Sequence, residues 1–228
     1  MTLKPPLWIT TAILALLILN VETSPEAAER RAFISIPILA VSSEDEVSAG
    51  SISTLVIQVE RQIAPAGLII EFNEGSKAYG IFKGRALEED SKQAARTAVL
   101  AGSKLAGEDS ETLRVTFKAV SNAYLIGGPS ASASIAVAII AALRGIAILP
   151  DVVITGATDV NGHILPVGGL PAKIHAAAAA GLTTVLIPTG QARTSQWDLG
   201  PLAERLGLTL VEVSTVNEAY ERMTGQSF

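Results

Sequence analysis

The sequence predicts one domain of mixed helices and strands, preceded by a separate hydrophobic segment. A length of 228 residues suits a single domain with an appendage. Apolar residues make up 49% of the chain, which is enough for a sizeable core. Strand-like alternation dominates the early part of the domain, and helical and strand patterns are mixed after it.

The composition excludes several classes of function. Charged residues make up 17% of the chain and the net charge is −5, without a basic stripe, so nucleic-acid binding has little support. The absence of cysteine excludes disulfides, thiol catalysis and cysteine-ligated metal. The chain has only two histidines, His163 and His175, and a histidine-based triad would have to use one of them.

The N-terminal segment resembles a signal peptide or a membrane anchor. Lys4 is the one cation of the first six residues, and Leu7–Val21 then carries no charge. This run is slightly shorter than the roughly 20 residues of a spanning helix. Because no convincing cleavage site follows, we favour an uncleaved anchor over a removed signal, and both over a buried core helix.

We therefore expect two parts, with residues 1–31 as signal or anchor and linker, and residues 32–228 as the folded domain. Lys4 lies on one side of the hydrophobic run and Arg30 and Arg31 on the other, so the charges decide the orientation only weakly. We expect the short tail inside and the domain outside the cytoplasm, either membrane-anchored or secreted.

The first half of the domain is predicted to be mostly strands. Alternation of apolar and polar residues indicates strands at Phe33–Val41, Ser51–Glu60, Leu68–Phe72 and Thr112–Val120. Pro37 lies within the first of these, which predicts an edge strand. Helical periodicity extends over Ala86–Ala106.

In the second half, helices and strands are mixed. The predicted helices are Ser130–Leu143, Leu170–Ala180, Gln196–Leu206 and Thr215–Met223. The predicted strands are Val152–Thr155, Thr184–Ile187 and Leu208–Val213, with a hairpin over Val160–Val167 that turns at Asn161-Gly162. Gly145 and Gly181 follow two of the helices and are expected to end them.

Two segments place a reactive side chain in the first turn of a helix, immediately after a glycine pair. They are Gly127-Gly128-Pro129-Ser130 and Gly168-Gly169-Leu170-Pro171-Ala172-Lys173. A helix N-terminus presents unpaired N–H groups and about half a positive charge. At Ser130 these N–H groups could stabilise the oxyanion of a tetrahedral intermediate. At Lys173 the same charge and an apolar setting disfavour the ammonium, as a lysine base requires.

Taken alone, each residue has a simpler interpretation. A serine that opens a helix is usually an N-cap, and a lysine near a helix start is usually exposed. Ser132 and Ser134 also compete for the role of nucleophile. His163 belongs to the predicted hairpin and His175 lies on a different helix face from Lys173, so a Ser–His mechanism and a metal site have little support.

Several motifs in a fixed order resemble the proteolytic domain of Lon proteases, peptidase family S16. Gly128-Pro129-Ser130-Ala131 resembles the nucleophile motif of that family. The family's base region is similar to Asp151–Gly156, Leu165–Gly169, Lys173 and Ala180–Pro188, in the same order. Lys173 follows Ser130 by 43 positions, which matches the spacing of the family's catalytic dyad.

The resemblance implies the α+β fold of the Lon proteolytic domain, which is ribosomal protein S5 domain 2-like. It implies Ser130 as nucleophile, Lys173 as general base and Thr155 as the residue that orients the lysine, with Gly128 and Pro129 in the oxyanion loop. It also implies a peptide or unfolded-protein substrate and a homohexamer, with no cofactor and no metal.

Three departures from the family pattern lead to finer expectations. Gly127 and Ala157 stand where the family often has acidic residues, and the sequence contains no Gly-x-x-x-x-Gly-Lys-Ser/Thr phosphate loop. The third departure favours a stand-alone, membrane-associated Lon-like type that works without ATP. The two missing acids motivate an alternative, an inactive Lon-fold interaction module. A small-molecule kinase of the galactokinase group is disfavoured, because it would not explain Lys173.

Overall fold

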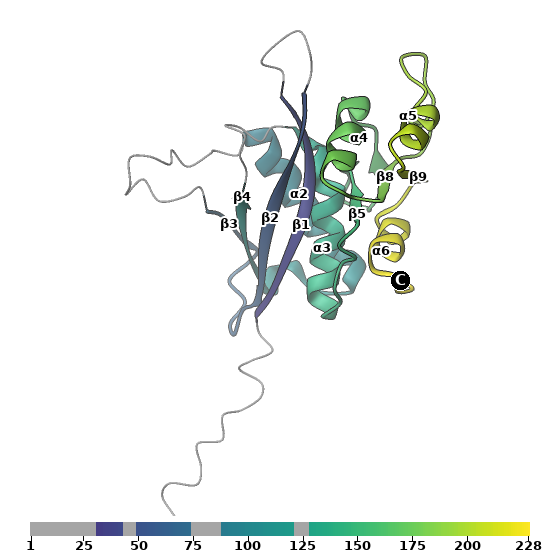
Figure 1. Cartoon of the computed structure of the whole chain (residues 1–228). Coiled ribbons are helices and arrows are strands. Elements are labelled where there is room, and N and C mark those ends of the chain that lie inside the picture. The colour runs from purple at the N-terminus through teal and green to yellow at the C-terminus, as the bar shows by residue number, and fades with distance from the viewer. Residues whose placement is uncertain (1–30, 43–48, 74–87, 121–127) are drawn as a thin grey trace, which may run out of the picture. The chain divides into compact units, whose positions relative to one another are not determined.

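The computed structural model describes residues 31–42, 49–73, 88–120 and 128–228 (Figure 1). These residues belong to one compact unit, Arg31–Phe228. The predicted hydrophobic segment Leu7–Val21 lies outside the described residues, and so does Gly127. Among the residues that are described, no helix is both long enough and apolar enough to cross a membrane.

A four-stranded sheet forms the first layer, with the strand order β1-β2-β4-β3. Strand β1 (Arg31–Ser42) is antiparallel to β2 (Ala49–Arg61), which is antiparallel to β4 (Leu113–Val120). The short strand β3 (Ile69–Phe72) runs parallel to β4. Strand β1 contains Pro37 and pairs with β2 alone among the described strands, so the predicted edge strand is confirmed.

Helices α2 (Glu89–Ala106) and α3 (Ser132–Arg144) cover one face of this sheet (Figure 1). Eleven consecutive residues of α3, from Ser132 to Ala142, are buried, as its almost uniformly apolar sequence predicts. Helices α2 and α3 cross closely at Gly102, where a Cβ atom would lie 2.8 Å from the carbonyl oxygen of Ala136. Helix α3 ends at Gly145, whose φ of 67° confirms the predicted stop.

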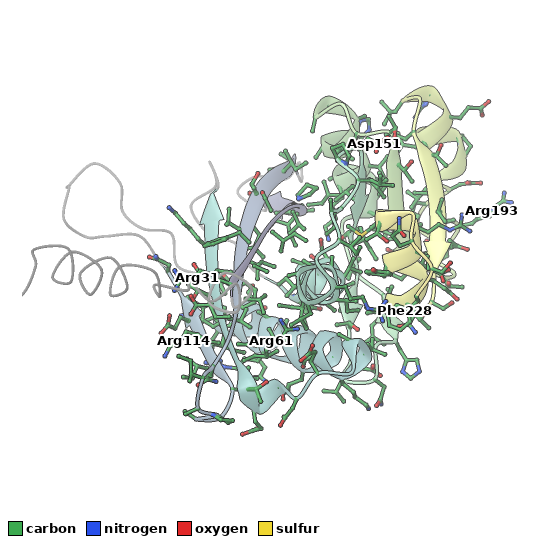
Figure 2. The ribbon with its side chains drawn as sticks, turned by 90° about the horizontal axis from the view of Figure 1, so that it is seen from below. Arg31, Arg61, Arg114, Asp151, Arg193 and Phe228 are labelled. Carbon is green, nitrogen blue, oxygen red and sulfur yellow. The ribbon has the colours of Figure 1, made fainter. Side chains whose placement is uncertain are left out.

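The C-terminal part forms a second, parallel sheet with the order β5-β8-β9. Its strands are β5 (Val152–Ile154), β8 (Thr184–Pro188) and β9 (Thr209–Val213). The helices of this part are α4 (Leu170–Ala179), α5 (Gly200–Arg205) and α6 (Val216–Thr224). Helices α4 and α5 share a second hydrophobic core with β5 and β8, whereas α6 packs against α3 in the first core. Figure 2 labels Arg61 and Arg114 among the elements of the first sheet, and Asp151 and Arg193 among those of the second.

Most predicted elements differ from the observed ones by a few residues at their ends; helix α3, for example, begins at Ser132 and not at Ser130, which lies in a preceding 3-10 turn. Two elements differ more. The hairpin consists of β6 (Ala157–Thr158) and β7 (Ile164–Leu165), so its first strand precedes Val160, where we expected it. Its turn is longer than an Asn-Gly pair, because Asp159 Oδ1 accepts bonds from the N–H groups of both Asn161 and His163. Helix α5 begins at Gly200 and not at Gln196, because a bridge between Arg193 and Asp198 closes a loop ahead of it.

Strand β2 of the first sheet lies close to α4 at Gly50. A Cβ atom at Gly50 would lie 1.9 Å from the carbonyl oxygen of Ala172, a backbone atom in the first turn of α4. Position 50 therefore requires glycine because there is no room for a side chain, and α4 would have to move if one were introduced.

We predict that Gly50→Ala lowers the free energy of unfolding by about 1–3 kcal/mol, the usual range for overpacking. The matched control is Gly200→Ala, since the closest atom to a Cβ there is at an ordinary 3.5 Å. The control should be neutral or slightly stabilising, because alanine reduces the entropy of the unfolded chain. Urea unfolding of both variants is the measurement, and equal stabilities would contradict the close approach.

Candidate active site

Ser130 lies in a 3-10 turn, Pro129–Ala131, which leads directly into α3. The residue before this turn, Gly128, has φ 84° and ψ 159°, a conformation that is essentially restricted to glycine. A Cβ atom at Gly128 would meet nothing within 4 Å. The requirement for glycine here therefore comes from the backbone conformation and not from lack of space.

Three consecutive carbonyl groups of this turn accept hydrogen bonds from three different elements. The carbonyl of Gly128 accepts from Ser91 Oγ of α2 at 3.2 Å. The carbonyl of Pro129 accepts from Ser132 Oγ of α3 at 2.8 Å. The carbonyl of Ser130 accepts from the N–H of Gly156, between β5 and β6, at 2.9 Å. The turn that carries Ser130 is thus held on three sides.

The structure separates the three serines that the sequence left in competition. Ser132 is 1% exposed, and its hydroxyl also accepts a bond from the N–H of Thr158 at 2.9 Å. Ser134 is fully buried, and its hydroxyl has no hydrogen-bond partner among the residues that the structure describes. Ser130 is half-buried and lines an open cleft. Of the three side chains, Ser130 is the one that a ligand in this cleft can reach.

Lys173 is a buried lysine in the first turn of α4. Its side chain is 3% exposed, and Nζ donates a 3.0 Å hydrogen bond to Oγ1 of Thr155, which is 1% exposed. Burial lowers the pKa of Lys173 to about 8 from its ordinary value of 10.5, because desolvation penalises the ammonium. No ion pair joins Lys173 to a carboxylate in the described part of the chain.

Two adjacent residues, Thr155 and Gly156, connect the lysine to the serine turn. The side chain of Thr155 holds Lys173, and its N–H donates to Leu186 of β8 at 3.0 Å. Gly156 donates to the carbonyl of Ser130 and accepts from the N–H of Ala133 at 3.1 Å. A shift of this segment would therefore move both side chains together.

Ser130 and Lys173 line the same cleft, which has a volume of about 430 Å³. Its walls come from β1, from the turn that carries Ser130 and from the segment that precedes α4, and comprise Ala40, Val41, Gly128, Pro129, Pro166, Val167, Gly168 and Gly169. A second, mostly apolar cavity is also lined by Ser130, together with residues of α2 such as Ser91. The structure thus brings together Ser130, Lys173, Gly128 and Pro129 around one cleft, and Thr155 lies behind the lysine.

Three residues that support this site carried no signal in the sequence. Gly50 allows α4 to approach the first sheet, and Ser91 holds the carbonyl of Gly128. The side-chain amide of Gln191 accepts from the N–H of Val167 and donates to its carbonyl, both at 2.9 Å, which fixes a wall of the cleft. Each role depends on a contact between segments that are distant in sequence.

The two histidines lie away from the cleft. His175 is exposed on α4. His163 is exposed in the hairpin, where its Nδ1 lies 2.8 Å from Oδ2 of Asp159, and this hydrogen bond lowers the pKa of the Asp159 carboxyl. In the parts of the chain that the structure describes, no group of three or more His, Cys, Asp or Glu side chains could hold a metal.

Comparison with known proteins identifies the family. Residues 84–224 match the Lon protease (S16) C-terminal proteolytic domain, and the chain belongs to this family. The archaeal Lon protease of Archaeoglobus fulgidus is 36% identical over 138 residues, which cover 60% of this chain and 22% of that protein.

Two further relatives show the same pattern. The archaeal Lon protease of Pyrococcus abyssi is 32% identical over 174 residues, covering 75% of this chain and 16% of that protein. Lon protease 1 of Bacillus subtilis is 38% identical over 96 residues, which cover 41% of this chain and 12% of that protein. The chain thus matches about a fifth or less of the length of these relatives.

The buried lysine predicts a pH-dependent change in stability. Below pH 8 the Lys173 ammonium is buried in the folded protein, and the desolvation of this charge destabilises the folded state. Between pH 8 and 10.5 the folded state loses this proton before the unfolded state does, so wild-type stability rises with pH. We predict that Lys173→Met is more stable than wild type at pH 7, and that this advantage shrinks by roughly 2 kcal/mol by pH 9.5.

Urea unfolding of both proteins at pH 7 and 9.5 measures this difference. Lys104→Met, which removes an exposed lysine, controls for the general effect of losing a lysine. A stability difference between Lys173→Met and wild type that does not change with pH would contradict the burial of an ionisable Lys173.

Proposed function

We propose that this domain is a serine endopeptidase that uses Ser130 as nucleophile and Lys173 as general base. The observation that carries the proposal is the buried lysine with a pKa of about 8, which lines the same cleft as Ser130. A lysine with an ordinary pKa is almost fully protonated near neutral pH and cannot accept a proton. The desolvated Lys173 has a substantial neutral fraction there, as a general base requires.

In the proposed reaction, the neutral Nζ of Lys173 accepts the proton of Ser130 Oγ while Oγ attacks the scissile carbonyl. The ammonium then gives this proton to the leaving amine, and an acyl-enzyme forms. Water attacks the acyl-enzyme with Lys173 again as base, which releases the acid and restores Ser130. Throughout, Thr155 keeps Nζ in place by its hydrogen bond.

The turn before α3 is the proposed oxyanion site. Pro129 has no N–H, so the main-chain donors that flank it are those of Gly128 and Ser130. The restraint of three consecutive carbonyls in this turn supports the proposal, because oxyanion donors are effective when they are held in position before the reaction.

A catalytically inactive interaction module is the alternative. It rests on Gly127 and Ala157, which replace residues that are often acidic in the family. Gly127 lies outside the described residues, and Ala157 is buried in β6. The peptidase proposal does not need an acid at either position, because burial alone lowers the pKa of the lysine.

We also propose that the chain cleaves peptides or unfolded proteins without ATP, as a stand-alone Lon-like peptidase that forms a homohexamer. The lack of a phosphate-loop motif in the sequence supports the first part. The uncharged segment Leu7–Val21 supports attachment to a membrane, and we propose that the domain then lies outside the cytoplasm. Membrane fractionation of the full chain tests this attachment, and recovery of intact protein in the supernatant would contradict it.

The proposed dyad predicts the outcome of chemical labelling. A serine-reactive electrophile should label Ser130 in wild type, and the labelling rate should rise with pH through a single titration near pH 8. Labelling and activity should be lost in Ser130→Ala, which lacks the nucleophile, and in Lys173→Met, which lacks the base. They should also be lost in Lys173→Arg, because guanidinium stays protonated. Ser134→Ala should retain both, since it removes a buried hydroxyl without a partner. Mass spectrometry identifies the labelled residue.

Each other outcome of this experiment has a distinct meaning. A well-folded wild type that is not labelled at any pH would favour the interaction module. Equal labelling of Lys173→Met and wild type would show that another group is the base.

The proposal also predicts that cleavage does not require ATP. Unfolded casein should be cleaved at the same rate with and without ATP, whereas a stably folded protein should resist cleavage in both conditions. Gel electrophoresis of the products over time is sufficient, with Ser130→Ala as the control for contaminating peptidases. A strong increase in casein cleavage on adding ATP to the purified wild type would refute independence from nucleotide.

A further inference from the structure

Ser91 of α2 is the one side chain from outside α3 that is bonded to the described part of the serine turn. Its Oγ donates to the carbonyl of Gly128 at 3.2 Å, and Asp90 Oδ1 lies farther from this Oγ, at 3.5 Å. Ser91, Gly128 and Ser130 line the same small apolar cavity. We propose that Ser91 is a positioning residue for the peptidase reaction, which fixes the peptide group of Gly128 and thereby the nucleophile two residues later.

The conformation of Gly128 explains why this bond matters. The combination of φ 84° and ψ 159° is open to glycine and essentially to no other residue, and a glycine backbone has many other conformations available, so contacts with neighbouring groups have to select this one. The carbonyls of Pro129 and Ser130 are held by α3 and by Gly156, whereas the carbonyl of Gly128 is held by Ser91. Loss of the Ser91 hydroxyl would therefore free the peptide group of Gly128, whose glycine backbone is the most flexible of the segment.

The location of Ser91 makes it an effective support. Helix α2 packs against both α3 and the turn that carries Ser130, so Ser91 lies on an element that adjoins the nucleophile. Ser91 does not act as the N-cap of α2, a position that Glu88 occupies. Ser91 Oγ therefore donates to this segment from a different element than the one that carries the nucleophile.

This inference rests on the proposed function, and its main effect should be on rate. Displacement of a nucleophile by about 1 Å can reduce the rate by two orders of magnitude. We expect Ser91→Ala to reduce the rate of Ser130 labelling and the kcat for peptide cleavage by about ten-fold. The KM and the limb near pH 8 should stay unchanged, because Lys173 and Thr155 are untouched.

Two further variants make the test specific. Ser91→Thr keeps the hydroxyl and should restore most of the rate. Thr97→Ala is the matched control, because Thr97 Oγ1 also donates to a carbonyl at 3.2 Å, that of Gln93, on the exposed side of the same helix. It should label like wild type. Urea unfolding of each variant shows whether a rate change follows from loss of folded protein.

A second measurement detects the hydrogen bond without using activity. The sequence has two Gly-Pro pairs, Gly128-Pro129 and Gly200-Pro201. Labelling with carbonyl-13C glycine and 15N proline therefore gives two coupled NMR signals, and Gly200 is the internal reference. In Ser91→Ala the carbonyl shift of Gly128 should change, that of Gly200 should not, and Ser91→Thr should restore the first.

The outcomes separate the two proposals. Wild-type labelling of Ser91→Ala, a rate loss that matches its loss of folded protein, or an unchanged Gly128 shift would each overturn the role of Ser91 and leave the dyad intact. Failure to label Ser130 in wild type would overturn the peptidase proposal and, with it, the catalytic role of Ser91. A ten-fold rate loss with a changed Gly128 shift and rescue by threonine supports the role of Ser91.

Discussion

The hydrogen bond between buried Lys173 and Thr155 is the interaction on which the rest of the site depends. An ammonium that loses its water is unstable unless polar groups replace that water, and among the described residues the hydroxyl of Thr155 does so at 3.0 Å. Thr155 can take this position because β5 is a fully buried strand that pairs with β8. The parallel sheet of the C-terminal part thus holds the hydroxyl that bonds to the lysine. The same burial that destabilises the folded protein brings the pKa of the lysine to about 8.

Close approaches at three glycines bring the elements around this site together. Gly50 lets β2 touch the first turn of α4, and a Cβ atom at Gly169 would lie 2.6 Å from a methyl carbon of Val41 in β1. A Cβ atom at Gly156 would lie 2.8 Å from a methyl carbon of Ile164 in the hairpin. At each of these three glycines, the neighbouring element lies so close that a side chain would not fit without a shift. Because interiors are close-packed, small changes at these positions are transmitted to the elements that carry Ser130 and Lys173.

The sequence predicted much of this architecture because its signals are local. Alternation located the long strands, uniform apolarity located α3, and Gly145 and Gly181 marked helix ends. The start of α5 was wrong because a loop closed by Arg193 and Asp198 replaces the first expected turn. At the site, the glycine pairs and their spacing indicated Ser130 and Lys173. They could not rank Ser130 above Ser132 or Ser134, because burial and hydrogen bonding of these hydroxyls depend on β5, β6 and α2, which are distant in sequence.

The burial of Lys173 also bears on Ala157, which stands where the resemblance to Lon proteases leads us to expect an acidic residue. A carboxylate near a lysine favours the ammonium and raises the pKa, which would oppose the effect of desolvation. In the described residues Lys173 has a neutral hydroxyl as its partner, and desolvation is the cause of its lowered pKa. An acidic residue two positions after Thr155 would add a negative charge to the segment that holds the lysine. Alanine at this position is therefore compatible with a lysine base, because it leaves the pKa of Lys173 to be set by burial.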